Sequence, residues 1–200
     1  LPPEWIEGRP PRMWGRHGFW QVRLRWAAAP VMIVGLLIGL ALDFEVSIVP
    51  IVAIAVASLL YNAVLAWVFS RYKDHFEHDP KLERQVTLLE ALADYVAIFL
   101  LVYFTGGVSS PLVVFLIFHV IITAIQFSAA TAYKLAGLAA AALWLLLLAQ
   151  VEGWIGQPTF AFKGAQITLL DRPVYAAVML FVCPAMLFIS AAMTARVMRR

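Results

Sequence analysis

The sequence predicts an all-α, polytopic membrane protein with six transmembrane helices and with both ends of the chain in the cytoplasm. The first observation is composition: 63% of the residues are hydrophobic and 14% are charged, whereas a soluble domain is roughly 45–50% apolar and about 25% charged. The second is that the apolar residues form runs of about 17–25, the length of a helix that crosses a bilayer. The third is the uneven distribution of Lys and Arg along the chain.

The apolar runs do not alternate with polar residues as the strands of an outer-membrane barrel do, so each run is expected to be a helix. The expected helices are 26–42, 46–70, 86–104, 112–128, 133–151 and 174–195. The chain then divides into an interfacial amino-terminal arm (1–25), a six-helix transmembrane domain (26–195) and the start of a cytoplasmic carboxyl-terminal segment (196–200).

The basic residues give the expected orientation. The connections between the first and second, third and fourth, and fifth and sixth helices lie on one side of the membrane. Of the 15 Lys and Arg residues, only Lys163 and Arg172 fall on that side. The positive-inside rule places the other, basic side in the cytoplasm, and we expect a bacterial inner-membrane protein surrounded by the lipid bilayer. No basic stripe with interleaved aromatic residues occurs, so nucleic acid is not an expected partner.

Three connecting segments carry polar residues. The arm 1–25 places prolines and tryptophans among arginines, which is typical of a segment lying at the headgroup level. The loop 71–84 contains His75 and His78, a spacing that can hold a metal on one helix face, although its balanced charges favour a solvated loop. The outside loop 152–173 is expected to contain a short hairpin or interfacial turn at 159–170.

The turn between the third and fourth helices is the first candidate site. Gly106 and Gly107 permit positive φ angles and a close approach to the backbone. Ser110 and Pro111 are expected to be the N-cap and the first residue of the fourth helix, whose free N–H groups would suit a carbonyl or anionic oxygen. The alternative is a tight helical hairpin without a ligand.

Polar residues inside the bilayer are the second candidate, because ionisable groups there are costly and usually face a partner or a cavity. Counting from the turn places Asp94 level with Thr123, with Gln126 one turn further in and His119 about a turn nearer the outside. These four side chains are expected to form a polar seam that hydrogen-bonds a quinone carbonyl and exchanges a proton with it. Interhelical hydrogen bonding without any ligand is the alternative.

Pro184 should kink the last helix because it removes a backbone hydrogen bond. Such a kink would serve either as a hinge or as static packing. Cys183, the single cysteine, excludes an internal disulfide framework.

The stretch from Asp94 through Thr105-Gly-Gly-Val-Ser-Ser-Pro111 to Phe118-His119-Val-Ile-Ile122 resembles the membrane-embedded sensor region of bacterial sensor histidine kinases, including the redox-responsive RegB/PrrB group. In that group a Gly-Gly-x-x-Asn-Pro-Phe motif between the third and fourth helices is associated with quinone sensing. The matching residues are Gly106, Gly107 and Pro111, whereas Ser110 and Leu112 replace the Asn and the Phe.

The resemblance implies a signal-input domain that senses quinone, the one possible cofactor, and that works as a homodimer. It also implies that a longer parent chain would be a histidine kinase, because these residues contain no nucleotide loop or nucleophile motif and no certain enzyme activity. The alternative is an accessory or structural subunit of a larger membrane redox or photosynthetic complex. No metal site and no catalytic residue is expected.

Overall fold

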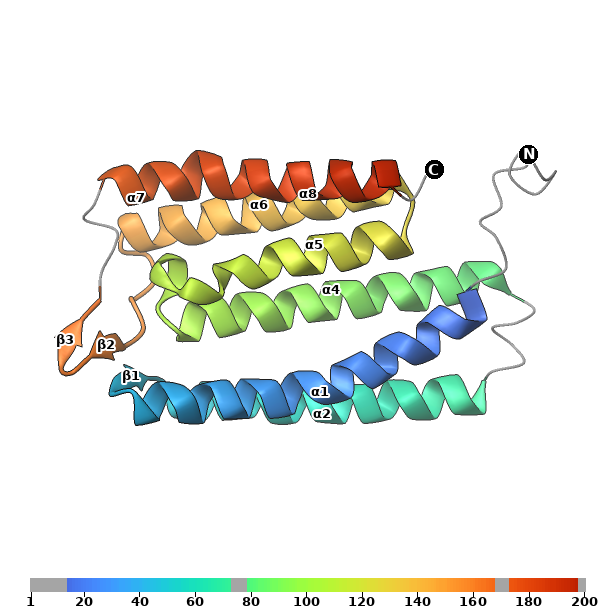
Figure 1. Ribbon diagram of the computed structural model, residues 1–200, viewed down its shortest axis with the longest axis horizontal. Coiled ribbons are helices and arrows are strands. Elements are labelled where there is room, and N and C mark those ends of the chain that lie inside the picture. The colour runs from blue at the N-terminus through green and yellow to red at the C-terminus, as the bar shows by residue number, and fades with distance from the viewer. Residues whose placement is uncertain (1–13, 73–78, 168–172, 198–200) are drawn as a thin grey trace.

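The computed structural model describes residues 14–72, 79–167 and 173–197. It is 82% helical, and its described helices group in chain order into six rods. The rods run roughly side by side (Figure 1). The first 13 residues of the arm, and His75 and His78 of the charged loop, lie outside the described residues.

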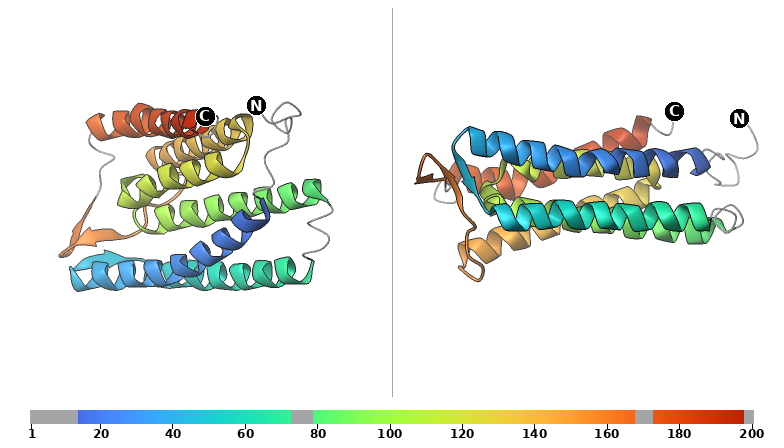
Figure 2. Two further views of the ribbon diagram at one scale, coloured as in Figure 1. Left: turned by 45° about the vertical axis from the view of Figure 1, so that its right-hand side comes forward. Right: turned by 90° about the horizontal axis from the view of Figure 1, so that it is seen from below.

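The first pair of helices forms a hairpin. α1 (Trp14–Ala41) begins at Trp14 rather than at residue 26, because no proline interrupts the arm between Pro11 and Pro30. α2 (Ile48–Arg71) follows after a short strand. The two helices lie side by side in both further views, and α2 joins the pair to the rest of the bundle by packing on α4 (Figure 2).

The helices that follow begin earlier than expected where a side chain caps them. α4 (Pro80–Phe104) starts with Pro80 after Asp79, whose carboxylate accepts the Lys81 N–H at 3.0 Å. α6 (Ala129–Val151) starts after Ser128, whose hydroxyl accepts the Thr131 N–H at 3.4 Å.

The fourth and sixth rods each contain irregular segments. The fourth is two short 3₁₀ helices, η2 and η3, followed by an α-helix, and the sixth is two α-helices separated by a π-helix. Their bounds are η2 (Gly107–Ser109), η3 (Pro111–Val113), α5 (Val114–Gln126), α7 (Pro173–Ala177), η4 (Val178–Val182) and α8 (Cys183–Val197).

The otherwise helical structure has a three-stranded antiparallel sheet at one end of the bundle, of which one strand was not predicted. The hairpin of β2 (Phe160–Phe162) and β3 (Ala165–Gln166) confirms the one expected at 159–170. β1 (Phe44–Val46) pairs with β2, which delays the start of α2. The pairing joins segments more than 100 residues apart, which local sequence patterns do not reveal.

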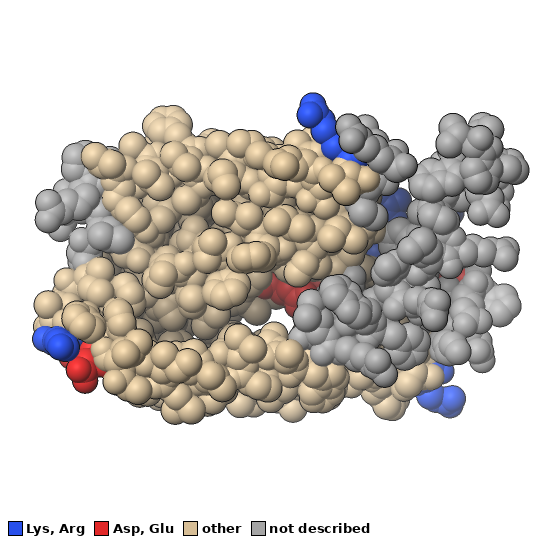
Figure 3. Space-filling view, viewed as in Figure 1, with Lys and Arg blue, Asp and Glu red and all other residues tan. Residues whose placement is uncertain are grey.

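Length and composition support membrane insertion. Among the described residues, four helices are long and apolar enough to cross a membrane: α2, residues 84–104 of α4, α6, and the continuous stretch 174–197. The apolar stretches 26–41 and 111–126 are shorter. On the face shown in Figure 3, Lys and Arg lie at the two ends of the molecule, and acidic atoms lie in a hollow between the α1–α2 pair and the other helices.

The core lies between α4, α5, α6 and α8. Many large apolar side chains are exposed on the surfaces of the helices, as expected of helices that lie in a bilayer. The largest apolar side chains that are almost fully buried are Val102, Val108, Leu116, Val120, Leu143 and Leu187.

Candidate functional site

The turn between α4 and η3 needs both of its glycines. Gly106 and Gly107 have φ angles of 119° and 64°, a region that residues with a Cβ rarely adopt. A Cβ on Gly106 would lie 2.9 Å from the Cβ of Phe160 in β2, and a Cβ on Gly107 would overlap the amide of Gln150 in α6. The turn is therefore packed against two other elements, not open to the surroundings.

Hydroxyl groups close the turn through a chain of hydrogen bonds. Thr105 Oγ1 donates to the Leu101 carbonyl at 2.7 Å and lies 2.6 Å from Ser110 Oγ. A hydroxyl has one hydrogen, so Ser110 must be the donor to Thr105. Ser110 Oγ also accepts the Leu112 N–H at 3.1 Å, and Pro111 is the first residue of η3, which confirms the predicted cap.

Two side chains from other helices hold the peptide groups of Val108. Gln150 Oε1 accepts the Val108 N–H at 2.9 Å, and the Tyr175 hydroxyl donates to the Val108 carbonyl at 2.7 Å. At the start of the fourth helix, where free N–H groups were expected, the Leu112 N–H is therefore already bonded to the Ser110 cap. The Ser110 hydroxyl satisfies the Leu112 N–H, and the buried Gln150 satisfies the Val108 N–H, both within the protein.

His119 lies on α5 against α4. Its Nε2 is 3.2 Å from the Ala91 carbonyl, and its ring meets the Tyr95 ring edge-on at 4.3 Å between centroids. Ala91 and Tyr95 lie on either side of Asp94 along α4. His119 is therefore at the same depth in the bundle as Asp94, and not one helical turn nearer the outside as predicted. The 3₁₀ segments before α5 rise about 2.0 Å per residue, more than an α-helix does, which moves His119 inward.

The other residues of the expected seam belong to the same α4–α5 interface. Thr123 is fully buried and donates to the Val120 carbonyl of its own helix at 3.0 Å. The Tyr95 hydroxyl is buried and lies close to Thr123. Asp94 and Gln126 are half-buried.

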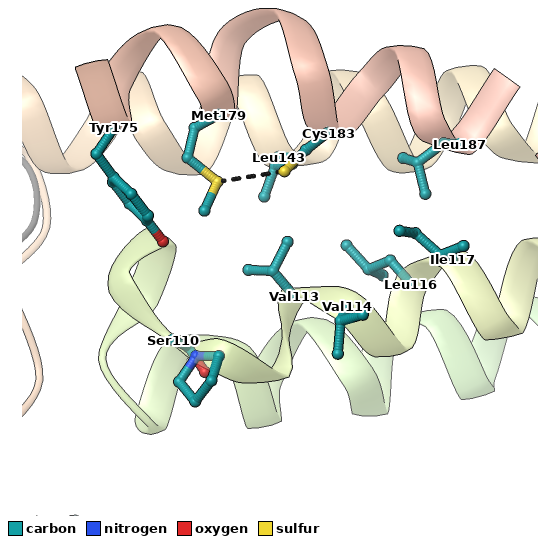
Figure 4. A pocket seen from close by; sticks show the side chains of 11 residues that line it. Ser110, Val113, Val114, Leu116, Ile117, Leu143, Tyr175, Met179, Cys183 and Leu187 are labelled. Carbon is teal, nitrogen blue, oxygen red and sulfur yellow. Dashed lines mark hydrogen bonds between the residues drawn. The ribbon is translucent and has the colours of Figure 1, made fainter. Parts of the chain in front are cut away.

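A cavity of about 230 Å³ lies on the opposite side of α5, between α5, α6 and α8 (Figure 4). We call it the α5–α8 cavity. Ser110 and Pro111 line it, whereas none of His119, Asp94 and Thr123 does. Its wall is apolar apart from Ser110, Tyr175 and Cys183; the other lining residues are Pro111, Val113, Val114, Leu116, Ile117, Leu143, Met179 and Leu187.

The sixth helix changes from α-helical to π-helical register beside this cavity. The Cys183 N–H bonds to the Val178 carbonyl in π-helical register. Pro184 has no N–H to give to the Leu180 carbonyl four residues before it. The indole N–H of Trp144 in α6 supplies the missing donor, at 2.9 Å from the Leu180 oxygen. The π-helix η4 thus ends just before Cys183 and Pro184, and a neighbouring helix satisfies its Leu180 carbonyl.

Four residues at these places are not among the predicted site residues. Tyr175, Gln150 and Trp144 bond to backbone groups far away in the chain, so no local pattern marks them. Glu90 has only 3% of its surface exposed. Glu90 could have been predicted from the sequence, because a carboxyl side chain within the expected helix 86–104 is as unusual there as that of Asp94.

Metal binding finds no support within the described part of the chain, where no group of three or more His, Cys, Asp or Glu side chains is placed to hold an ion.

The described residues form a predominantly helical protein in which four helices have the length and composition to cross a membrane. Comparisons with protein-family models, with curated proteins and with solved structures give no match.

Proposed function

We propose that this chain is the membrane-embedded signal-input domain of a bacterial sensor, in which a small apolar ligand occupies the α5–α8 cavity. Each of the six rods would cross the inner membrane, with α1 beginning and α8 ending on the cytoplasmic side. The basic residues support this orientation. Arg71, Lys81, Lys134 and Arg196 lie at one end of the bundle, and Lys163 lies in the β2–β3 turn at the other.

The position of the cavity carries the proposal. It lies between the turn that resembles the quinone-associated motif and the π-helix η4 of the sixth helix. A ligand there would touch Ser110 and Val113 on one side and Met179 and Cys183 on the other. A bound molecule changes an equilibrium only by contacting its two states differently, and a cavity between two helices provides such contacts.

The sixth helix is suited to carry the change to the cytoplasmic side. Its π-helix η4 contributes Met179 to the cavity wall, and α8 continues from Cys183 to Val197. Single-turn π segments are often found at functional positions in helices. A change between π and α register in η4 would rotate or shift α8 without unfolding it.

The test is a distance measurement across the cytoplasmic end of the bundle. Spin labels at Lys134→Cys and Arg196→Cys report the separation of α6 and α8 in nanodiscs. The background is Cys183→Ala, whose ligand affinity is first compared with that of the unmodified protein because Cys183 lines the cavity. We expect decylubiquinone, either oxidised or reduced, to change this distance. An unchanged distance with both forms would contradict the proposal.

A matched pair of substitutions locates the response. Val113 is 7% exposed and lines the cavity, whereas Val96 is 58% exposed on the lipid face of α4. Val113→Phe should fill the cavity and weaken the response roughly tenfold, since overpacking costs about 1–3 kcal/mol. Val96→Phe adds the same atoms outside the cavity and should leave the response unchanged.

A further inference from the structure

The polar groups of the α5–α8 cavity have no hydrogen left to donate. The Tyr175 hydroxyl gives its only hydrogen to the Val108 carbonyl at 2.7 Å. A carbonyl oxygen accepts and never donates, so the direction of this bond is certain. Tyr175 Oη therefore offers a ligand only acceptor lone pairs.

The hydroxyl hydrogen of Ser110 is also already used in a hydrogen bond. The Thr105 hydroxyl hydrogen is used by the Leu101 carbonyl at 2.7 Å, so the Ser110 hydroxyl hydrogen must lie between Ser110 and Thr105. Ser110 Oγ accepts the Leu112 N–H and keeps one lone pair.

The thiol hydrogen of Cys183, the third polar group of the wall, is used in the same way. The Cys183 thiol is directed to Met179 Sδ at 3.7 Å. The amide nitrogen of Gln150 is an unused donor, but Gln150 lies against Gly107 and does not line the cavity.

From this inventory we infer that the cavity selects a small apolar molecule that carries a hydroxyl donor, such as a phenol or the ring of a quinol, and discriminates against a molecule that can only accept. This inference rests on the proposed function and specifies its ligand. A quinone carbonyl would meet only acceptor oxygens, whereas a ring hydroxyl would donate to Tyr175 or Ser110. The size fits one ring, since an apolar cavity of about 150 Å³ already binds benzene and this one measures about 230 Å³.

Two isomers with the same atoms test the inference. 4-Ethylphenol has a hydroxyl donor, and 4-methylanisole has only an ether oxygen. Equilibrium dialysis against nanodiscs with and without the protein corrects for partition of each compound into lipid. We expect the phenol to bind roughly three- to tenfold more tightly, which is the usual contribution of one hydrogen bond.

Tyr175→Phe removes the acceptor and keeps the ring. It should abolish the preference for the phenol while the affinity for 4-methylanisole stays within about twofold, because the cavity remains. A merely structural effect would weaken both isomers together. Tyr103→Phe is the control: it also removes a tyrosine hydroxyl at this end of the bundle, one bonded to the Gly156 carbonyl, and Tyr103 does not line the cavity.

The same assay with decylubiquinol and decylubiquinone distinguishes a membrane quinol from a free phenol as the source of the hydroxyl. Tighter binding of the quinol supports the quinol, and binding of 4-ethylphenol without either decyl compound supports a free phenol. Equal affinities for the two isomers in the unmodified protein would overturn the inference and leave the proposed function standing. Absence of binding by all four compounds would overturn both.

Discussion

At the scale of single residues, the two adjacent glycines show how a turn restricts its own sequence. Gly106 and Gly107 both have positive φ, and each lacks the Cβ that would strike a neighbouring element. The packing of Gly107 against Gln150 also brings the glutamine oxygen to the Val108 N–H. One missing side chain thus permits both the turn and the bond that links it to α6.

Gly107→Ala should lower the free energy of unfolding by roughly 2–4 kcal/mol, because it adds positive-φ strain to an overlap with Gln150. Thermal or detergent unfolding of the purified protein measures the change. The control is Gly137→Ala in α6, where a Cβ would meet only the Phe188 ring, at 3.7 Å. That substitution should be neutral or stabilising by up to about 1 kcal/mol, since alanine favours helix.

A double substitution separates the two causes. Gln150→Ala removes the overlap but not the φ strain, so Gly107→Ala should cost less in that background than in the unmodified protein. Equal costs in both backgrounds would show that the glutamine does not restrict the glycine.

At the scale of elements, a side chain of α6 stabilises the π-helical segment of the sixth helix. Pro184 deprives the Leu180 carbonyl of its ordinary partner, and Trp144 replaces that partner from α6. In the apolar part of a bilayer no water would satisfy this carbonyl, so the indole compensates for the proline. This coupling of α6 to η4 lies beside the cavity.

Trp144→Phe should destabilise the protein by about 1 kcal/mol through loss of the hydrogen bond to Leu180. Pro184→Ala supplies a backbone N–H to the same carbonyl, so the cost of Trp144→Phe should nearly vanish in that background. A double-mutant cycle on the free energy of unfolding measures the coupling. Additive costs would mean that Trp144 contributes only packing.

At the scale of the whole molecule, the charge distribution predicts the orientation in the membrane. Lys163 and Lys134 are both exposed, at opposite ends of the bundle. In a Cys183→Ala background, a membrane-impermeant maleimide added outside cells with a permeabilised outer membrane should label Lys163→Cys and not Lys134→Cys. Lysis of the inner membrane should expose both, and the reverse labelling pattern would invert the proposed topology.

The sequence by itself determined the helical rods, the membrane-type composition and the capped turn. Each of these depends on neighbours in the chain: a run of apolar residues, a serine before a proline, or two glycines together. The β2–β3 hairpin is local for the same reason.

Only the tertiary structure decided what those features meet. The strand Phe44–Val46 pairs with β2, Gln150 and Tyr175 hold Val108, and Trp144 reaches Leu180, all across long separations in the chain. It also placed His119 against Tyr95, on the other side of α5 from the cavity. Hydrophobic periodicity gives each helix its length but not its rotation or its neighbours, and these set which side chains share a site.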